Sequence, residues 1–261
     1  MDNKIDLHTH TYYSDGILSP TEVVKWAKNQ KLDQLAITDH DGIDGIREAM
    51  IAGEALELTV IPGIEFSAEE PGGITMHILG YHIDIGNQEL KNRLEDIRQK
   101  RKDRNEKLLI ALVDLGYPLD PEDFVKNGNA DYLGKPDFAR ALMKKGYIEE
   151  FSEAFEDGRF LMSEEIRAIR KVKISAEEAI QLILGAGGLP VLAHPMKVFG
   201  LHGDYFDALD NLIGLLKGYG LKGLECFYPE HDEAETMKLV ELAEKYKLHI
   251  TKGTDFHGHK L

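Results

Sequence analysis

The sequence predicts an α/β fold, a parallel barrel that a helical segment interrupts once. In residues 1–86 and 171–261, short apolar runs alternate with amphipathic runs, which is the pattern of parallel strand–helix units. Residues 87–170 are instead rich in charge and keep helical spacing. A chain of 261 residues is long enough for such a barrel with an insertion. We therefore expect a barrel domain formed by 1–86 and 171–261 and a helical insertion domain at 87–170.

The first half of the barrel begins with an apolar run at residues 5–7, which we interpret as a short strand. Ser19 and Glu22 form a capping box with Pro20 at the first helical position, so a helix begins there and continues to about Gln30. The elements that follow are a strand at 35–38, a helix at 46–56, and strands at 59–61 and 74–81.

The insertion and the second half of the barrel are predicted in the same way. Leucines between Leu90 and Leu112 recur at helical spacing, and shorter helical patterns lie around 137–145 and 149–157. A second capping box, Ser175 with Glu178, begins a helix that ends at the glycine pair 187–188. The remaining elements are strands at 189–193, 223–227 and 248–251 and a helix at 233–246. In parallel barrels, functional residues lie at the carboxyl ends of the strands.

Composition argues against several classes of function. The net charge of −15 disfavours broad binding to nucleic acid or to an anionic membrane, although bound cations could still hold a small anionic substrate. No apolar run reaches the length of a membrane span, and the N-terminus lacks a signal-peptide pattern, so we expect a cytoplasmic protein. The single cysteine, Cys226, excludes an internal disulfide and fits a buried apolar position.

Histidines and acids recur where the predicted strands end. His8 and His10 lie two residues apart, so they point to the same face of the first strand, as two ligands of a divalent metal would. Taken singly, each candidate also has a plain interpretation, such as a turn aspartate for Asp15 or a satisfied core histidine for His77. Together they predict a metal site. The nine candidates, from six strand ends, are His8, His10, Asp15, His40, Glu65, His77, His194, Asp255 and His257.

The size and chemistry of this set indicate more than one ion. Nine ligands exceed the four that one zinc ion takes, so the set suits two or three divalent ions with a carboxylate such as Glu65 between them. Mixed nitrogen and oxygen ligands fit zinc, manganese or iron, and the absence of a thiolate argues against a purely structural zinc site.

These motifs, in this order, resemble those of the PHP (polymerase and histidinol phosphatase) family. The matching segments are DLHTH at 6–10, TDH at 38–40, PGIE at 62–65, MHILGY at 76–81, LAHP at 192–195 and GTDFHG at 253–258. The resemblance implies a distorted (β/α)7 barrel with a trinuclear metal centre. It also implies a first metal on His8, His10, Glu65 and Asp255, a second on Asp15, His40 and His257, and a third on Glu65, His77 and His194.

Within that family the chain is most similar to small phosphoesterases with a helical insertion, some of which hydrolyse 3′,5′-bisphosphonucleotides or trim 5′ ends of short RNA. That subgroup often has Gly-Arg-Pro-His at the start of a helix in the insertion, where this chain has Gly134, Lys135, Pro136 and Asp137. Lysine keeps the positive charge but loses the bidentate fork of arginine, and Asp137 puts an anion where a phosphate donor could stand. This departure concerns the substrate and not the metal chemistry.

The ligand set and the resemblance indicate a metal-dependent phosphoric ester hydrolase. Its substrate would be a nucleotide phosphate monoester, in a 3′,5′-bisphosphonucleotide or at the 5′ end of a short RNA, attacked by a metal-bridging hydroxide. Asp39 and His231 are the candidate proton donors, although Asp39 is suited to orient a ligand histidine and His231 to be a plain surface residue. Arg101, Arg104 and Lys135 are the candidate ligands of a second phosphate; the alternative is that they are solvated charges of the insertion.

Two other functions stay open at this point. A histidinol-phosphate phosphatase would use the same metal site but needs no second cationic subsite. A non-catalytic regulatory module would bind the metals without turnover. As an enzyme, the protein would have a small phosphorylated partner, such as a nucleotide or a short oligonucleotide, with no membrane and no large nucleic-acid interface. The sequence gives no information on protein partners.

Overall fold

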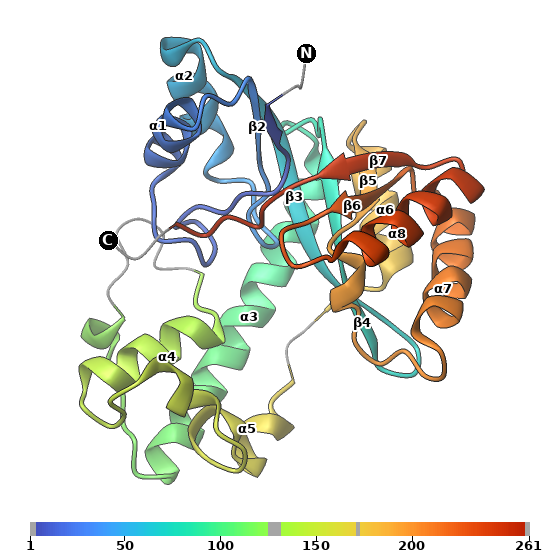
Figure 1. Cartoon of the computed structure of the whole chain (residues 1–261). Coiled ribbons are helices and arrows are strands. Elements are labelled where there is room, and N and C mark those ends of the chain that lie inside the picture. Colours follow the sequence, from blue (N-terminus) through green and yellow to red (C-terminus); the bar gives the residue numbers. More distant parts are fainter. Residues whose placement is uncertain (1–3, 125–131, 171–172, 259–261) are drawn as a thin grey trace.

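A seven-stranded sheet forms the centre of the computed structural model, which describes residues 4–124, 132–170 and 173–258 (Figure 1). Strand order follows chain order, and the sheet curls into a nearly closed barrel with helices outside it. The strands are β1 (Ile5–Asp6), β2 (Gln34–Ile37), β3 (Thr59–Glu70), β4 (Ile74–Tyr81), β5 (Leu189–Leu192), β6 (Gly223–Phe227) and β7 (His249–Lys252). The predicted α/β barrel with a helical insertion is confirmed. Within the described ranges, every helix is too short or too polar to cross a bilayer.

One strand departs from the parallel pattern that the sequence predicts. β4 pairs antiparallel with β3 and with β5, whereas the other neighbouring pairs are parallel. β3 and β4 are joined by a turn in which Gly72 and Gly73 have φ angles of +91° and +79°. A turn this short leaves no room for the crossover that two parallel strands need. The expectation of parallel strands is therefore wrong at β4.

The first and last strands meet through the segments that follow them. The backbone N–H of His10 donates to the carbonyl of Phe256 at 2.8 Å. Asp6 reinforces this seam, because its carboxylate accepts hydrogen bonds from the backbone N–H of Thr254 at 3.0 Å and from its hydroxyl at 2.5 Å. The seam thus brings the two histidines after β1 next to the acid and histidine after β7.

The barrel helices other than α2 (Ile46–Leu56) begin at residues whose side chains cap them. α1 (Pro20–Asn29) starts at the capping box of Ser19 and Glu22, as predicted. The predicted helices at 46–56, 175–187 and 233–246 correspond to α2, α6 (Ala176–Gly185) and α8 (Glu233–Lys245). The sequence prediction lacks α7 (Tyr205–Tyr219), although Asp204 caps it. Its buried face consists of Leu209, Leu212, Ile213 and Leu216.

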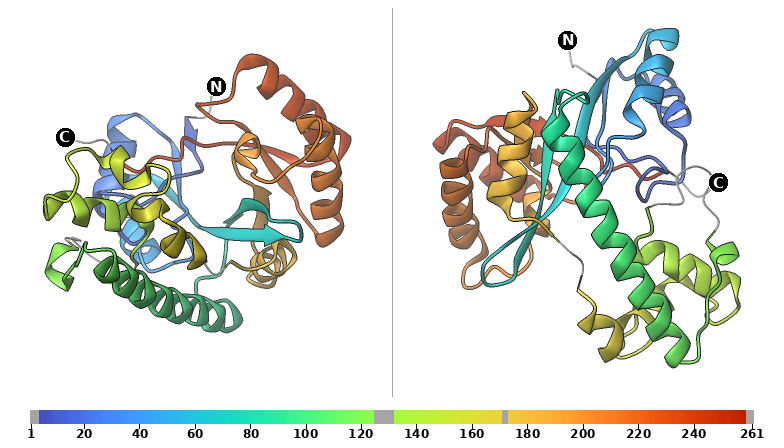
Figure 2. Two further views of the ribbon diagram at one scale, coloured as in Figure 1. Left: turned by 90° about the horizontal axis from the view of Figure 1, so that it is seen from below. Right: turned by 180° about the vertical axis from the view of Figure 1, so that it is seen from behind.

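The insertion begins with α3 (Gln88–Asp114), which runs from the flank of the barrel into a smaller helical layer (Figure 2). That layer contains α4 (Lys135–Lys144), α5 (Glu164–Ala168) and 3-10 helices at Pro121–Asp123, Phe151–Phe155 and Phe160–Met162. The helical pattern around 149–157 is therefore a 3-10 helix rather than an α-helix. It ends at Phe155, because Glu156 has an extended backbone with φ −66° and ψ 137°.

Two kinds of contact organise the insertion. It has a hydrophobic cluster of its own, which includes Leu108, Phe138, Leu142 and Leu161. Salt bridges then tie α3 to the barrel, and these join Arg93 to Glu178, Arg98 to Asp44 and Arg101 to Asp41. The domain division at 87–170 stays a prediction, and its second boundary adjoins residues outside the described part of the chain.

Candidate metal centre

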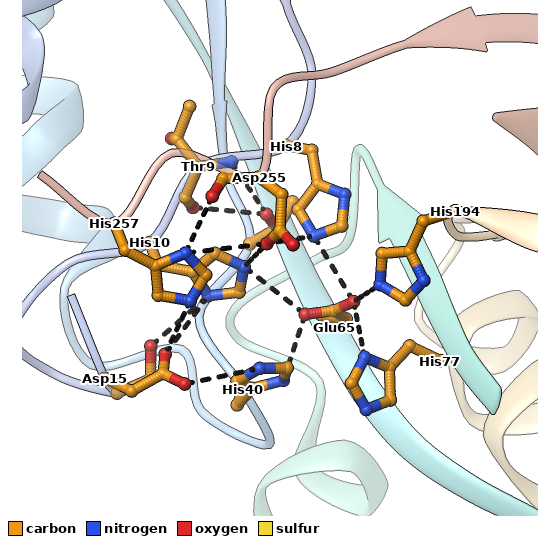
Figure 3. Close-up of polar contacts among 12 residues, drawn as sticks. His8, Thr9, His10, Asp15, His40, Glu65, His77, His194, Asp255 and His257 are labelled. Carbon is orange, nitrogen blue, oxygen red and sulfur yellow. Dashed lines mark hydrogen bonds and ion pairs between the residues drawn. The ribbon is translucent and has the colours of Figure 1, made fainter. Parts of the chain in front are cut away.

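The nine predicted ligands gather in one cluster with Glu65 at its centre (Figure 3). Seven of them follow the carboxyl ends of strands, whereas Glu65 and His77 lie within β3 and β4. Glu65 lies on β3 and is completely buried. Its two oxygens face five imidazole nitrogens from four other segments. Oε1 lies 3.2 Å from His8 Nε2, 3.0 Å from His77 Nδ1 and 3.1 Å from His194 Nε2, and Oε2 lies 3.3 Å from His10 Nε2 and 2.9 Å from His40 Nδ1.

Two further carboxylates flank Glu65. Asp255, after β7, places Oδ1 3.4 Å from Nε2 of His8 and 3.2 Å from Nε2 of His10. Asp15, in the loop after β1, lies on another side of the cluster (Figure 3). Its oxygens lie 3.7 Å from His10 Nδ1, 3.6 Å from His40 Nε2 and 3.1 Å from His257 Nε2.

The ligand atoms form three groups, each compact enough for one ion. The first group is His8, His10, Glu65 and Asp255; the second is His10, Asp15, His40 and His257; the third is His40, Glu65 and His77. The first contains the set that the resemblance implies, and the second contains the implied set with His10 added. In the third, His40 stands where the resemblance implies His194, although His194 also contacts Glu65. The assignment of these residues as ligands stays a prediction.

The chemistry of the cluster fits divalent ions. Of the ten buried side-chain atoms without a hydrogen-bond partner in the described part of the chain, six belong to it. These six are His8 Nε2, His10 Nε2, Asp15 Oδ1, His40 Nδ1, Glu65 Oε2 and His77 Nδ1. Bonds of about 2.1 Å to one ion place neighbouring ligand atoms about 3 Å apart, which is the spacing around Glu65. Buried polar atoms that lack partners in the protein are what a metal ion would satisfy.

The pKa values describe the same charge pattern. Burial alone would raise the pKa of Glu65, but His40, His77 and His8 hold it well below its usual value. Burial lowers the pKa of His10, yet Asp255 and Glu65 together raise it to about 10. Burial lowers the pKa of His77 to about 4 against the opposing charge of Glu65. The cluster thus combines ionised carboxylates with imidazoles of different basicity, and a metal ion would displace the protons held on the more basic ones.

Two candidate ligands have strained backbones. His194 has a φ angle of +22° and Asp255 one of +54°, a region that residues other than glycine seldom adopt. The turn after His194 is held by Tyr205, whose hydroxyl donates hydrogen bonds to the carbonyls of Pro195 at 2.8 Å and Val198 at 3.1 Å. Strain of this kind persists where the surrounding structure fixes a side chain in a functional position.

Asp39 lies beside the cluster and holds the loop that follows β1. Its carboxylate accepts hydrogen bonds from the backbone N–H of Thr11, the hydroxyl of Thr11 and the hydroxyl of Ser14, each at 2.7 Å. Ser14 Oγ in turn lies 3.4 Å from Nδ1 of His10. These contacts support the orienting role for Asp39 over proton donation, because its oxygens are directed at the loop that carries His10 and Asp15.

We predict that Asp39→Asn lowers metal affinity about 10-fold, because an amide offers an N–H to donors that need an acceptor. Competition with a chromophoric chelator measures this affinity. Asp44→Asn, at an aspartate with 41% exposure that pairs with Arg98 away from the cluster, is the matched control. A fall in turnover with unchanged metal affinity would contradict the orienting role and favour proton donation.

The structure does not bring His231 to the cluster. Its Nδ1 lies 3.0 Å from the carbonyl oxygen of Cys226, and the ring packs 5.2 Å from that of Tyr228. Tyr228 lies between His231 and the metal centre, since its ring also lies 5.7 Å from that of His194. His231 lines a separate cavity of about 590 Å³ with Trp26 and neighbouring residues.

Three residues at the cluster were missed in the sequence analysis. Glu225 on β6 contacts His8 from a fully buried position. The signal was present, because Glu225 lies between Leu224 and Cys226 in an apolar strand, as Glu65 does between Ile64 and Phe66. Tyr228 donates a hydrogen bond to Oδ2 of Asp255 at 3.0 Å. Lys197 contacts the Tyr228 hydroxyl and lines a cavity of about 310 Å³ beside His77, His194 and Asp255.

A second cavity, of about 390 Å³, joins the metal centre to the insertion. Asp15 and His40 line it on the barrel side, and the three predicted cations Arg101, Arg104 and Lys135 line it on the insertion side. The structure therefore brings all three cations to the edge of the metal centre. Arg167 and Arg170, which the sequence analysis did not single out, also line this cavity.

The three predicted cations differ in what already holds them. Arg101 bonds Asp41 at 2.6 Å and lies 4.2 Å from the centre of the Tyr132 ring. Lys135 donates a hydrogen bond to a backbone carbonyl in the insertion. Arg104 is 8% exposed, and its Nε has no hydrogen-bond partner among the described residues. Burial, and then the charge of Arg101, lower the pKa of Arg104.

The unusual Asp137 does not line this cavity. Its Oδ2 accepts a hydrogen bond from the backbone N–H of Gly134 at 2.8 Å, and its Oδ1 accepts one from Arg140 at 2.9 Å. Asp137 thus caps the start of α4, the position at which an acid stabilises a helix. The sequence predicts that the Asp137 carboxylate lies near the substrate. In the structure this carboxylate is directed at the start of α4 instead.

The chain is similar to known proteins over nearly all of its length. The phosphoribosyl 1,2-cyclic phosphate 1,2-diphosphodiesterase of Eggerthella lenta is 32% identical over 97% of this chain and 94% of its own length. The 3′,5′-nucleoside bisphosphate phosphatase of Chromobacterium violaceum is 30% identical over 97% of this chain and 87% of its own length. A solved structure of an amidohydrolase from Chromobacterium violaceum, with bound sulfate and no metal, superposes with a TM-score of 0.85 at 30% identity, covering 97% of this chain and 87% of that one.

The family assignment follows from these matches. A model of the PHP domain matches residues 6–186, more than half of the chain, and includes six of the nine clustered residues. The chain therefore belongs to the PHP domain family.

Proposed function

We propose that this protein removes a phosphate group from a nucleotide that carries a second phosphate, with two or three divalent ions (manganese, zinc or iron) in the cluster around Glu65. The chain is a metal-dependent phosphoric ester hydrolase of the PHP domain family. The nine clustered residues are the proposed metal ligands. The relatives that act on a nucleoside bisphosphate and on a cyclic ribose phosphate support a small phosphorylated substrate.

The main support for a second phosphate on the substrate is Nε of Arg104, which is buried and has no hydrogen-bond partner among the described residues. A guanidinium at 8% exposure without a carboxylate partner among the described residues is costly to desolvate. An anionic ligand offsets that cost, and phosphate matches the planar donor geometry of arginine. The sulfate bound in the Chromobacterium violaceum amidohydrolase supports an oxyanion as the ligand type.

Each group of residues has a separate task in this proposal. The ions, when bound, supply Lewis-acid activation of water and neutralise charge at phosphorus. Arg104 and Lys135 hold the second phosphate, and Arg101 forms the wall beside them. Asp15 and His40 line both this cavity and the cluster, so a substrate held by the cations presents its other phosphate to the metal centre.

The histidinol-phosphate alternative is less well supported. That substrate carries a single phosphate, so the metal centre alone would hold it and Arg104 would be left buried without an anion. A non-catalytic module is disfavoured because a cavity of about 390 Å³ opens directly onto the cluster at Asp15 and His40.

The test is phosphate release by manganese-reconstituted protein from adenosine 3′,5′-bisphosphate, adenosine monophosphate and histidinol phosphate, with a chelated control. The proposal predicts metal-dependent release that is fastest from the bisphosphate. Phosphate release from histidinol phosphate alone would contradict the proposal and support a histidinol-phosphate phosphatase. The absence of release from every substrate, with bound metal confirmed, would contradict a phosphatase function.

We further predict that Arg104→Met lowers kcat/KM for the bisphosphate about 10- to 100-fold, the usual cost of losing a hydrogen-bonded charge pair. The rate with a monophosphate should change little, because it lacks the second anion. Steady-state kinetics on both substrates measure the ratio. Arg98→Met, on the same helix but paired with Asp44, is the matched control. An unchanged ratio in Arg104→Met would remove this arginine from substrate binding.

A further inference from the structure

Glu225 is a completely buried carboxylate that contacts the metal centre without belonging to any of the three ligand groups. It lies on β6 between two apolar residues. Its Oε1 and Oε2 lie 3.0 and 3.2 Å from Nδ1 of His8, and Oε2 also accepts a hydrogen bond from the backbone N–H of His194 at 2.7 Å. One carboxylate thus contacts candidate ligands from two different segments of the barrel.

The contact with His8 decides which ring nitrogen is available to a metal. Nδ1–H donates to Glu225, which leaves Nε2 directed at Glu65 and Asp255, at 3.2 and 3.4 Å. A carboxylate on the far nitrogen of a ligand histidine fixes its tautomer and ring orientation and makes it a stronger ligand. Burial lowers the pKa of His8, but Glu225 and Glu65 raise it well above its usual value.

The contact with His194 fixes a strained residue. With a φ angle of +22°, His194 needs external support to keep its backbone in place. Its backbone N–H has that support from Glu225, while its ring reaches Oε1 of Glu65 at 3.1 Å. The rings of His8 and His194 also stack, with centroids 5.5 Å apart. A shift of either histidine therefore reaches the other through Glu225.

The packing around this carboxylate shows that it has little room to move. A Cβ atom at Gly253 would lie 2.6 Å from Oε1 of Glu225 and would also collide with Cβ of His8. Only a glycine at the end of β7 lets the carboxylate and the imidazole approach each other this closely.

We propose that Glu225 is a positioning residue that couples the first metal position, which contains His8, to the third, to which the resemblance assigns His194. The inference rests on the proposed ligand assignment. An ion on His8 fixes the ring, the ring fixes Glu225, and Glu225 holds the backbone of His194 in the orientation that suits the third ion. Coupling of this kind is reciprocal, so the two positions load cooperatively. The second position, on Asp15, His40 and His257, contains neither His8 nor His194, so Glu225 makes no contact with it.

The test is a calorimetric titration of the chelated full-length protein with Mn²⁺, for wild type and Glu225→Gln. A glutamine keeps the volume but has one acceptor oxygen, so one of the two donors loses its partner. We expect the affinities of the first and third positions for Mn²⁺ to fall 10- to 100-fold and their cooperativity to disappear. The affinity of the second position should stay unchanged. A uniform fall in all steps, or no change, would overturn the proposal.

Three further variants separate the possible causes. Glu70→Gln removes a buried carboxylate that bonds Ala176 and Tyr219 away from the cluster, and it should leave all binding steps intact. His8→Ala tests the ligand assignment itself. If His8→Ala keeps full metal binding, the assignment fails; if it loses metal while Glu225→Gln does not, only the coupling fails. Should Glu225→Gln not fold, Gly253→Ala separates the same pair of side chains and is expected to affect the same two steps.

Discussion

Glu65→Gln is expected to reduce phosphate release by roughly 10³-fold or more and to lower the number of bound ions. Glu65 is the one residue whose oxygens reach five of the clustered imidazoles, and it belongs to two of the three ligand groups. A neutral amide removes the negative charge from the centre and directs an N–H at imidazole nitrogens or ions. More than one metal position is damaged at once, so the loss should exceed that of a single transition-state hydrogen bond.

Kinetics with adenosine 3′,5′-bisphosphate and metal analysis by atomic emission measure this effect. Glu70→Gln is again the matched control, because Glu70 is also buried on β3 but lies away from the cluster. If Glu65→Gln folds, keeps its ions and turns over at the rate of the wild type, the central role of Glu65 is wrong.

Removal of the metals is expected to lower the melting temperature by about 10 °C. Six buried atoms of the cluster have no hydrogen-bond partner in the described part of the chain, so bound ions would supply the partners that they lack. An ion present at 1,000 times its dissociation constant stabilises the folded state by about 4 kcal/mol, and for a chain of this size each kcal/mol corresponds to about 2–4 °C.

Differential scanning calorimetry of the chelated protein, before and after Mn²⁺ is restored, measures the shift. His82 and His202, outside the cluster, offer a control for nonspecific binding of metal to surface histidines, since His82→Ala with His202→Ala should leave the shift unchanged. Equal melting temperatures with and without Mn²⁺ would contradict a metal site of this burial.

Local signals were sufficient to predict most of the fold. The capping box at Ser19 and the N-cap at Ser175 fixed two helix starts, and apolar runs located the strands. The direction of β4 could not be predicted in this way, because an apolar run does not show whether its neighbours are parallel. The clue was the length of the turn at Gly72 and Gly73, which is too short for a crossover.

The candidate site was predictable to the extent that strand ends converge. Because the carboxyl ends of barrel strands meet, the histidines and acids placed there had to come together. The contacts of residues that act through others do not follow from this convergence, although Glu225 has the same apolar neighbours in sequence as Glu65. Asp39 contacts Thr11 and Ser14 through a loop conformation, and Glu225 reaches His8 across 217 residues of sequence. His231 had the right residue type, but the ring of Tyr228 separates it from the cluster.

The most direct test of the central claim is a titration of the chelated protein with Mn²⁺ in which bound metal and phosphate release from adenosine 3′,5′-bisphosphate are followed together. The account predicts no release without metal and an activity that rises as two or three ions bind per chain. Release at the full rate from metal-free protein, or no release at full metal occupancy, would contradict the assignment of this cluster as a metal centre that hydrolyses phosphate esters.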